Sequence, residues 1–327
     1  MKVLAFVICV LTLFCNLSFD ICHLAYAEDP KETEALFVAK KAFEDGFYEV
    51  SLGLLDRFLK AYPSSDKTAE ANLIAAECFY HQDRFLEALP KFEALLDDPK
   101  ASKFRDAIYY WIAEVHFKGN NFSKAAEFYK KVIDDYPKSA YVVSAYYSLG
   151  WCLFQDQKYS QAMEYFDLVE QKFPNEPFAR DSGMKIVECL YNLKDYGGLK
   201  NRARLYIKTN AKDSTKLAFL YFYLAEADYY LNNFNDAVDG YNKVISRITD
   251  DRIKALSGLG LGWSYLKLKQ YAQAQDTFSK VKQENLDKKS QSVLLLGQAI
   301  LMTETKRFGE AGTYYDKLLE IADDETA

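Results

Sequence analysis

Four glutamates recur at regular spacing along this chain of 327 residues and could in principle carry acid–base chemistry. They are Glu77, Glu114, Glu188 and Glu226. Two carboxylates act as a catalytic pair only when both reach the same bond of a substrate. These four are separated by whole units of the repeat described below. We therefore expect a solvated acidic stripe and no carboxylate pair.

The other reactive side chains form no catalytic or metal-binding pattern. His81 and His116 stand at different positions of their repeats, with no cysteine or second histidine at the spacing of metal ligands. The sequence has no glycine-rich phosphate loop and no nucleophile elbow. We expect a protein that is not an enzyme and that has no metal ion and no cofactor.

A repeat of 37 residues positions all of these side chains. Six alanines, one serine and one leucine share one column of the repeat, with a single step of 38 residues: Ser51, Ala88, Ala125, Ala162, Leu199, Ala237, Ala274 and Ala311. An aromatic residue stands three positions before each of them, from Tyr48 to Phe308. A repeat of this length predicts a solenoid of helix pairs, which presents an extended binding surface.

The segment 143–179 shows the pattern of one helix pair. Its first half has an apolar stripe at the i, i+3, i+4, i+7 spacing of a helix, formed by Tyr146, Leu149, Gly150 and Leu153. A second helix is predicted from Ser160. Gly150 and Ala162 are small enough for the two helices to approach closely. Pro174 then ends the second helix, because proline lacks the amide donor.

This arrangement resembles the tetratricopeptide repeat from about Ala35 to about Ile321. The small first-helix position of that family corresponds to Ala39, Ala76, Ala113, Gly150, Val187, Ala225, Gly262 and Ala299. Its closing proline is present as Pro63, Pro137 and Pro174, and it lies one residue early as Pro99. The resemblance implies an all-α, right-handed superhelical solenoid of eight TPR-like helix pairs over residues 28–321, and a protein-binding scaffold.

The segment 107–140 is similar to tetratricopeptide proteins of the bacterial cell envelope. Those relatives act in outer-membrane assembly and in Tol-Pal-associated cell division. The chain shows neither a coiled coil ahead of its repeats nor a lipid-attachment cysteine. The resemblance implies a non-enzymatic scaffold that recruits envelope proteins.

In this family the first helices line a concave groove, and three columns of this chain are expected to face it. Fifteen of the sixteen residues in two of these columns are apolar or aromatic. The third column contains the four glutamates together with Trp151 and Trp263. We predict that a partner segment, apolar or basic, binds to Tyr110, Glu114, Phe117, Tyr147, Trp151, Phe154, Glu188, Tyr191, Phe222, Glu226, Tyr229 and Trp263.

Three other interpretations stay open at this point. The groove aromatics could simply pad each first helix against its neighbours. The chain could be a structural subunit that oligomerises through its ends, because no solvating helix follows the last repeat and Tyr314, Leu318 or Leu319 would be partly exposed. The aromatic groove could also bind a carbohydrate such as peptidoglycan.

The first 27 residues predict export. Lys2 precedes an apolar run from Val3 to Cys15, and Ala25-Tyr26-Ala27 forms a small-x-small cleavage site. The run is shorter than the roughly 20 residues that span a bilayer as a helix. We expect a signal peptide over residues 1–27 and a periplasmic protein without a membrane span in the mature chain. An uncleaved anchor is the alternative, because Asp20 and His23 make the stretch before the cleavage site polar for a signal.

The net charge and the cysteines restrict the class of partner and the kind of chemistry that we expect. The net charge of −6 argues against a nucleic-acid partner, which would need a basic surface. Outside the signal peptide the cysteines are Cys78, Cys152 and Cys189, which share one position of the first helix. Their repeat spacing predicts buried free thiols, because helices in neighbouring repeats lie too far apart for a disulfide.

Repeat five and the chain ends depart from the pattern. Leu199 and Val187 are large at the contact between the helices, so we predict a change of superhelical curvature near residues 195–215. Lys200, Arg202 and Arg204 are expected to form a solvated basic face. Asp29 should cap the first helix, with Glu32 completing a capping box. An acidic tail, residues 322–327, follows the repeats.

Overall fold

The structure is a computed structural model that describes residues 29–209 and 214–324. These residues form sixteen α-helices and two short 3-10 helices, with no strand, so the predicted all-α class is confirmed. The predicted signal peptide and residues 325–327 of the predicted acidic tail lie outside the described residues. The chain divides into two compact units, residues 1–145 and 146–327, named unit one and unit two.

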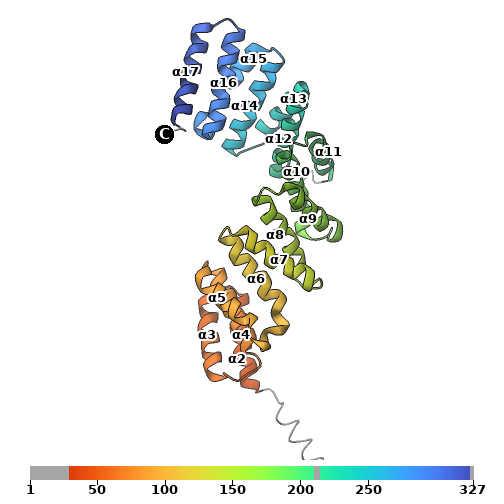
Figure 1. Cartoon of the computed structure of the whole chain (residues 1–327), viewed down its shortest axis with the longest axis vertical. Helices are drawn as coiled ribbons and strands as arrows, with labels where there is room; N and C mark the ends of the chain where they lie inside the picture. The colour runs from red at the N-terminus through yellow and green to blue at the C-terminus, as the bar shows by residue number, and fades with distance from the viewer. Residues whose placement is uncertain (1–28, 210–213, 325–327) are drawn as a thin grey trace, which may run out of the picture. The chain divides into compact units, whose positions relative to one another are not determined.

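Successive helices form the eight predicted pairs (Figure 1). Unit one contains α2 (Pro30–Glu44), α3 (Tyr48–Ala61), α4 (Thr68–His81), α5 (Phe85–Leu96), η1 (Pro99–Phe104), α6 (Arg105–Lys118) and α7 (Phe122–Asp135). Helix α8 (Val142–Gln155) begins at the end of unit one. Unit two continues with α9 (Tyr159–Lys172), α10 (Pro177–Asn192), α11 (Tyr196–Thr209), α12 (Ser214–Tyr230), α13 (Phe234–Ile245), α14 (Asp251–Lys267), α15 (Tyr271–Lys280), η2 (Gln283–Asn285), α16 (Lys288–Glu304) and α17 (Phe308–Asp324).

The column of small residues holds each pair together. Its eight members are all buried, and seven of them have no exposed surface. Most of the facing small residues of the first helices are also fully buried. In the first pair the Ser51 hydroxyl donates a 2.9 Å hydrogen bond to the carbonyl of Ala39. Large apolar side chains such as Phe58, Phe92 and Phe166 fill the core beside these contacts. The close approach predicted from the small residues is confirmed.

The turn inside each helix pair uses a left-handed residue at a fixed position. The first turn has Gly46 there, with a φ of 80°. The other seven turns place a non-glycine residue in this conformation: Asp83, Asn120, Gln157, Lys194, Asn232, Lys269 and Lys306. Side chains are disfavoured at such φ values, so the packing of the two helices imposes this turn on whatever residue is present.

Repeat five keeps its large residues fully buried. Leu199 and Val187 have no exposed surface, and neither does Ala203. The predicted curvature change stays a prediction, because residues 210–213 lie outside the described residues. The predicted solvated basic face is wrong for two of its three members. Lys200 is paired with the buried Asp228 and Arg202 with Glu170, and only Arg204 is exposed.

The three cysteines Cys78, Cys152 and Cys189 are buried thiols, as predicted. Burial raises the pKa of the Cys78 thiol to about 11 and that of Cys189 to about 12. A thiol is reactive only as its thiolate, so these cysteines serve as packing residues.

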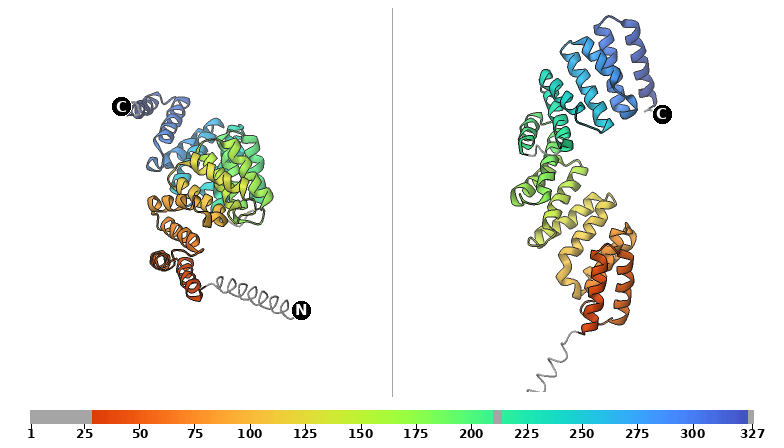
Figure 2. Two further views of the ribbon diagram at one scale, coloured as in Figure 1. Left: turned by 60° about the horizontal axis from the view of Figure 1, so that its bottom comes forward. Right: turned by 180° about the vertical axis from the view of Figure 1, so that it is seen from behind.

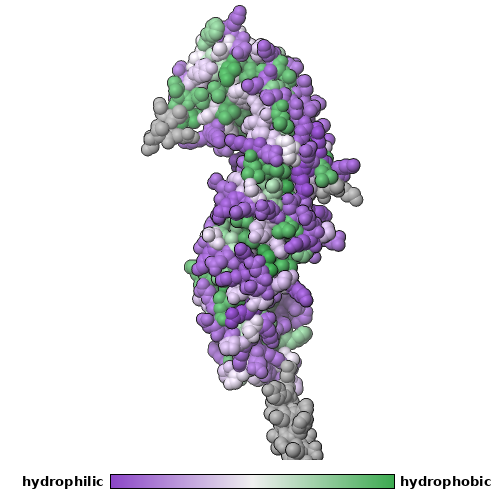
Figure 3. All heavy atoms as spheres, turned by 45° about the vertical axis from the view of Figure 1, so that its right-hand side comes forward, coloured by the Kyte–Doolittle hydropathy of each residue, from purple (hydrophilic) through white to green (hydrophobic). Residues whose placement is uncertain are grey.

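The first and last helices leave apolar side chains exposed. Phe37 and Val50 are 58% exposed on α2 and α3, and Leu319 is 62% exposed on α17. Helices α16 and α17 lie side by side as the final pair (Figure 2). Apolar patches interrupt a largely polar surface (Figure 3). Asp29 caps α2 as predicted, but Glu32 accepts a hydrogen bond from the Ser65 hydroxyl, so the predicted capping box is wrong.

Candidate functional site

The twelve predicted groove residues are all partly buried, and they fall into three groups. Tyr110, Glu114 and Phe117 lie in unit one. Tyr147, Trp151, Phe154 and Glu188 lie near the beginning of unit two. Tyr191, Phe222, Glu226, Tyr229 and Trp263 line one cavity of unit two, which we name the Glu226 cavity. The structure therefore brings five of the twelve residues together in an open site.

The Glu226 cavity has a volume of about 800 Å³ and lies among α10, α12, α14 and α16, with Tyr241 of α13 at its base. Helix α14 contributes Ile253, Leu256 and Gly260 at helical spacing. Gly260 is required here, because a β-carbon at this position would overlap the ring of Tyr241. Most of the lining is aromatic or aliphatic, as is usual for sites that bind a ligand.

Two tyrosines hold the carboxylate of Glu226. The Tyr241 hydroxyl donates to Oε1 at 2.5 Å, and the Tyr191 hydroxyl donates to Oε2 at 3.1 Å. Unit one contains the same arrangement, in which Tyr129 and Tyr80 donate to Glu114 at 2.6 Å and 3.0 Å. The expected solvated stripe is therefore wrong at these two glutamates. Each carboxylate joins its own helix pair to the first helix of the preceding repeat.

Burial raises the pKa of Glu226, and the hydrogen bonds from Tyr241 and Tyr191 partly oppose this shift. In the described part of the chain no lysine, arginine or histidine nitrogen lies within 4 Å of its carboxylate, so the carboxylate has no ion-pair partner there. A buried carboxylate is costly unless a cation or several donors compensate it. Glu226 thus has two neutral donors and no cation beside it among the described residues.

Charged side chains surround the mouth of the cavity. Asp250 caps α14 through the amide of Ile253 at 2.9 Å. Asp287 caps α16 through the amide of Ser290 at 2.8 Å and pairs with Arg252 at 3.2 Å. The Ser290 amide and hydroxyl hydrogen bonds lower the pKa of Asp287, with a further contribution from Arg252. Arg252 is therefore engaged at the mouth.

The second group contains a residue that the sequence analysis missed. The Lys185 ammonium lies 3.8 Å from the ring centre of Trp151 and 5.5 Å from that of Phe154. It also forms a 2.7 Å ion pair with Glu188. We name these four residues the Lys185 cluster. Tyr147 packs beside it against Phe166 and Phe178. The chain's own lysine thus occupies this part of the predicted groove.

The unit-one group is packed internally. Tyr110 stacks on Tyr141 with ring centres 4.6 Å apart and contacts Trp111 edge to face at 5.4 Å. Phe117 contacts Phe122 in the same way at 5.5 Å. In this group the observed contacts fit the interpretation that the groove aromatics pad each first helix against its neighbours. Glu77 is buried nearby, which raises its pKa to about 7, and the Trp111 indole opposes this shift.

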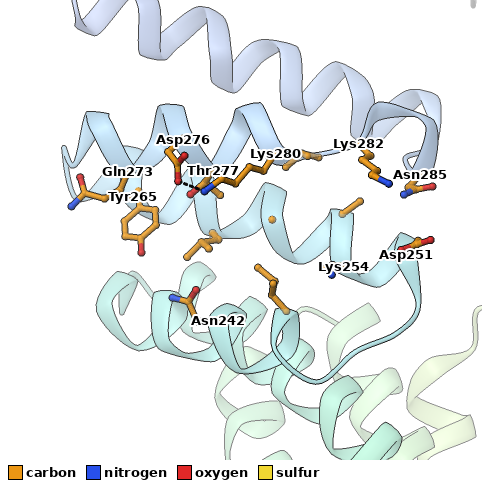
Figure 4. A pocket seen from close by; sticks show the side chains of 15 residues that line it. Asn242, Asp251, Lys254, Tyr265, Gln273, Asp276, Thr277, Lys280, Lys282 and Asn285 are labelled. Carbon is orange, nitrogen blue, oxygen red and sulfur yellow. Dashed lines mark hydrogen bonds and ion pairs between the residues drawn. The ribbon is translucent and has the colours of Figure 1, made fainter.

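A second cavity on the opposite face of α14 was not predicted. It has a volume of about 480 Å³ and lies among α13, α14 and α15 (Figure 4). Lys280 and Asp276 form a 2.6 Å ion pair at its edge. Helix α15 has only 10 residues, and the chain leaves it at Val281, which lines the cavity together with Lys282. No closing proline follows repeats six and seven, which was the available sequence signal.

Sequence profiles of the tetratricopeptide repeat match residues 39–103, 107–139, 144–176 and 257–285. The chain contains tetratricopeptide repeats. Tetratricopeptide repeats generally mediate protein–protein interactions, and their scaffold is typically non-enzymatic. The match over residues 257–285 includes Trp263 of the Glu226 cavity. No curated protein sequence matches the chain.

Two solved structures are similar to this chain in fold. A tetratricopeptide repeat protein from Parabacteroides merdae is 16% identical, with a TM-score of 0.52, and the alignment covers 83% of this chain and 100% of that one. The apo form of RapI is 14% identical with a TM-score of 0.51, over 79% of this chain and 98% of that one. At such identities the two structures support the fold alone.

Two further findings concern the described residues only. No group of three histidine, cysteine, aspartate or glutamate side chains is arranged there to hold a metal ion. No described helix combines the length and apolar character needed to cross a membrane. The Glu226 cavity is therefore suited to binding a ligand, through its apolar lining and the carboxyl group of Glu226.

Proposed function

We propose that this chain is an exported scaffold of the bacterial cell envelope that binds a segment of a partner protein in the Glu226 cavity. The observation that carries the proposal is the cavity itself, in which an aromatic lining surrounds the carboxyl group of Glu226, which has no ion-pair partner among the described residues. Aromatic side chains with polar edges dominate the energetic centres of protein interfaces. A partner segment would bury this lining and meet the carboxylate.

Export rests on the pattern of residues 1–27, and the envelope role rests on the resemblance of residues 107–140. Alkaline phosphatase fused after residue 27 should be active in cells, because this enzyme needs an oxidising compartment for its disulfides. An inactive fusion at normal expression would count against export and leave the binding site untouched. Outer-membrane assembly and cell division are the pathways that the resemblance favours.

The binding site is tested by blocking the cavity without touching the core. Val293 on α16 lines the cavity and is 37% exposed, so Val293→Lys should fill the mouth and keep the fold. Thr303→Lys, at an exposed position of the same helix, adds the same charge elsewhere. In pull-downs from envelope extract the mature chain and Thr303→Lys should retain a shared partner, and Val293→Lys should lose it. Retention by all three would place the partner on another surface.

Self-association through the ends is the second candidate. It is favoured by the exposed apolar side chains Phe308, Tyr315 and Leu319 on α17. Several exposed apolar side chains on one helix suit contact with a second copy of the chain. Light scattering of the mature chain should then show a mass that rises with concentration, and Leu319→Glu should abolish this rise. A constant monomer mass would exclude this candidate.

A further inference from the structure

We infer that the Glu226 cavity recognises one lysine side chain of the bound segment. This inference rests on the proposed function and specifies the chemistry of the same site. It starts from the Lys185 cluster, where the chain itself shows how this column of the repeat binds a lysine.

The Lys185 cluster combines a tryptophan and a glutamate from neighbouring repeats. Trp151 and Glu188 occupy the same column in repeats four and five. The ammonium of Lys185 lies 3.8 Å from the ring centre of Trp151 and 2.7 Å from Glu188 Oε2. Its side chain is only 16% exposed. A cation held over an aromatic ring and paired with a carboxylate is favourable when partly desolvated.

The Glu226 cavity contains the same two residue types in the same column. Glu226 and Trp263 occupy it in repeats six and seven, and both line the cavity. The position that holds Lys185 in repeat five holds Tyr223 in repeat six and Gly260 in repeat seven. Both of these residues also line the cavity. The site thus has the carboxylate and the ring but no internal lysine, and its open volume of about 800 Å³ can admit a side chain from outside.

The charges around the cavity favour a cation that comes from outside. Glu226 has no ion-pair partner among the described residues, and Asp287 already engages Arg252. The remaining cation of the mouth, Lys289, is exposed at the start of α16. An incoming ammonium would compensate the buried carboxylate, while the apolar stem of lysine would pack on the aromatic lining.

The test is a selection of peptides that does not assume a sequence. A random heptapeptide library is displayed on phage, and the phage that bind the immobilised Val293→Lys variant are removed. The remaining phage are then selected for binding to the mature chain. Peptides with one lysine between apolar residues should be enriched. Selected peptides without a basic residue would overturn the inference and leave the proposed function standing. No enrichment of any peptide would overturn both.

The best peptide is then made with lysine and with norleucine, which keeps the apolar stem and removes the charge. The mature chain should bind the lysine form about tenfold more tightly. Glu226→Gln should abolish this preference. Glu188→Gln should keep it, because Lys185 already occupies Glu188. A preference that survives Glu226→Gln would overturn the inference.

Tyr223→Lys provides a second test if Glu226→Gln fails to fold. It places a lysine three residues before Glu226, as Lys185 stands three residues before Glu188. The internal ammonium should then occupy the carboxylate, and the lysine and norleucine peptides should bind equally. Unchanged discrimination by Tyr223→Lys would show that Glu226 is not the recognition group.

Discussion

The hydroxyl of Tyr241 lies 2.5 Å from Oε1 of Glu226, in the same relationship that places Tyr129 2.6 Å from Oε1 of Glu114. In both cases the tyrosine stands fifteen residues after the glutamate, on the second helix of the same pair. Repeats two and five have Phe92 and Ala203 at this position, and their glutamates have no such donor. The tyrosine therefore distinguishes the glutamates that join repeats from those that do not.

Replacing Tyr241 by phenylalanine should destabilise unit two by about 1–3 kcal/mol, because the buried carboxylate loses a donor and nothing replaces it. The pKa of Glu226 should rise further above its ordinary value, since Tyr241 now lowers it. Urea unfolding at pH 7 measures the stability change. Tyr229→Phe is the control, because no described hydrogen bond of its hydroxyl reaches a carboxylate. Equal effects of the two variants would contradict the role given to Tyr241.

Glu77 should make unit one less stable as the pH rises. Burial raises its pKa from 4.5 to about 7 in the folded state, so the folded protein binds the proton more tightly than the unfolded chain. The contribution of Glu77 to the free energy of unfolding is then greatest below pH 4.5. About 3 kcal/mol of it is lost as the pH rises to about 7. Urea titrations from pH 4.5 to pH 7.5 should show this loss relative to Glu77→Gln. Parallel curves for the two proteins would show that Glu77 titrates normally.

Removing the Lys185 side chain should leave a gap that a small amine of matching length can refill from solution. Lys185→Ala breaks the contacts with Trp151 and Glu188 and should cost about 2–4 kcal/mol. Propylammonium has the length and charge of the part that alanine lacks, so it should raise the melting temperature of this variant and not that of the unchanged protein. Propanol controls for the apolar stem. Equal rescue by propanol would mean that the charge is unimportant.

Gly262→Ala should destabilise unit two, although alanine is the better helix former. A β-carbon at Gly262 would overlap the ring of Phe278, and such overpacking costs about 1–3 kcal/mol. Gly312→Ala on α17 is the matched control, because no atom lies within 4 Å of the new methyl group. That variant should gain up to about 1 kcal/mol. Thermal unfolding of both proteins compares the signs, and a stabilised Gly262→Ala would refute the close approach.

The helix pairs could be predicted because they depend on local pattern. The column from Ser51 to Ala311 and the closing prolines Pro63, Pro137 and Pro174 define the helices within a few residues. The small size of these residues also predicted their burial. These features depend on contacts within one helix pair, so the residues of a single repeat are enough to predict them.

The environment of the groove residues could not be predicted in the same way. Whether Glu226 faces solvent depends on the rotation between neighbouring repeats, which brings Tyr191 to it from 35 residues earlier. Lys185 did leave a signal, because it is the one charged residue of its column and stands three residues before Glu188. The left-handed turns at Gln157 and Lys194 left none, since these residue types do not favour that conformation.

The tyrosine–glutamate–tyrosine bridges also bear on the order in which the array comes apart. In a linear array each repeat is stabilised mainly by its neighbours, so opening begins where a boundary is weakest. Glu114 fastens repeat three to repeat two, and Glu226 fastens repeat six to repeat five. Among the described residues, the main contacts of α2 are with α3 and α4, and those of α17 are with α16. Fraying should therefore proceed inward from both ends, and the amides around these two bridges should be the last to exchange their hydrogens.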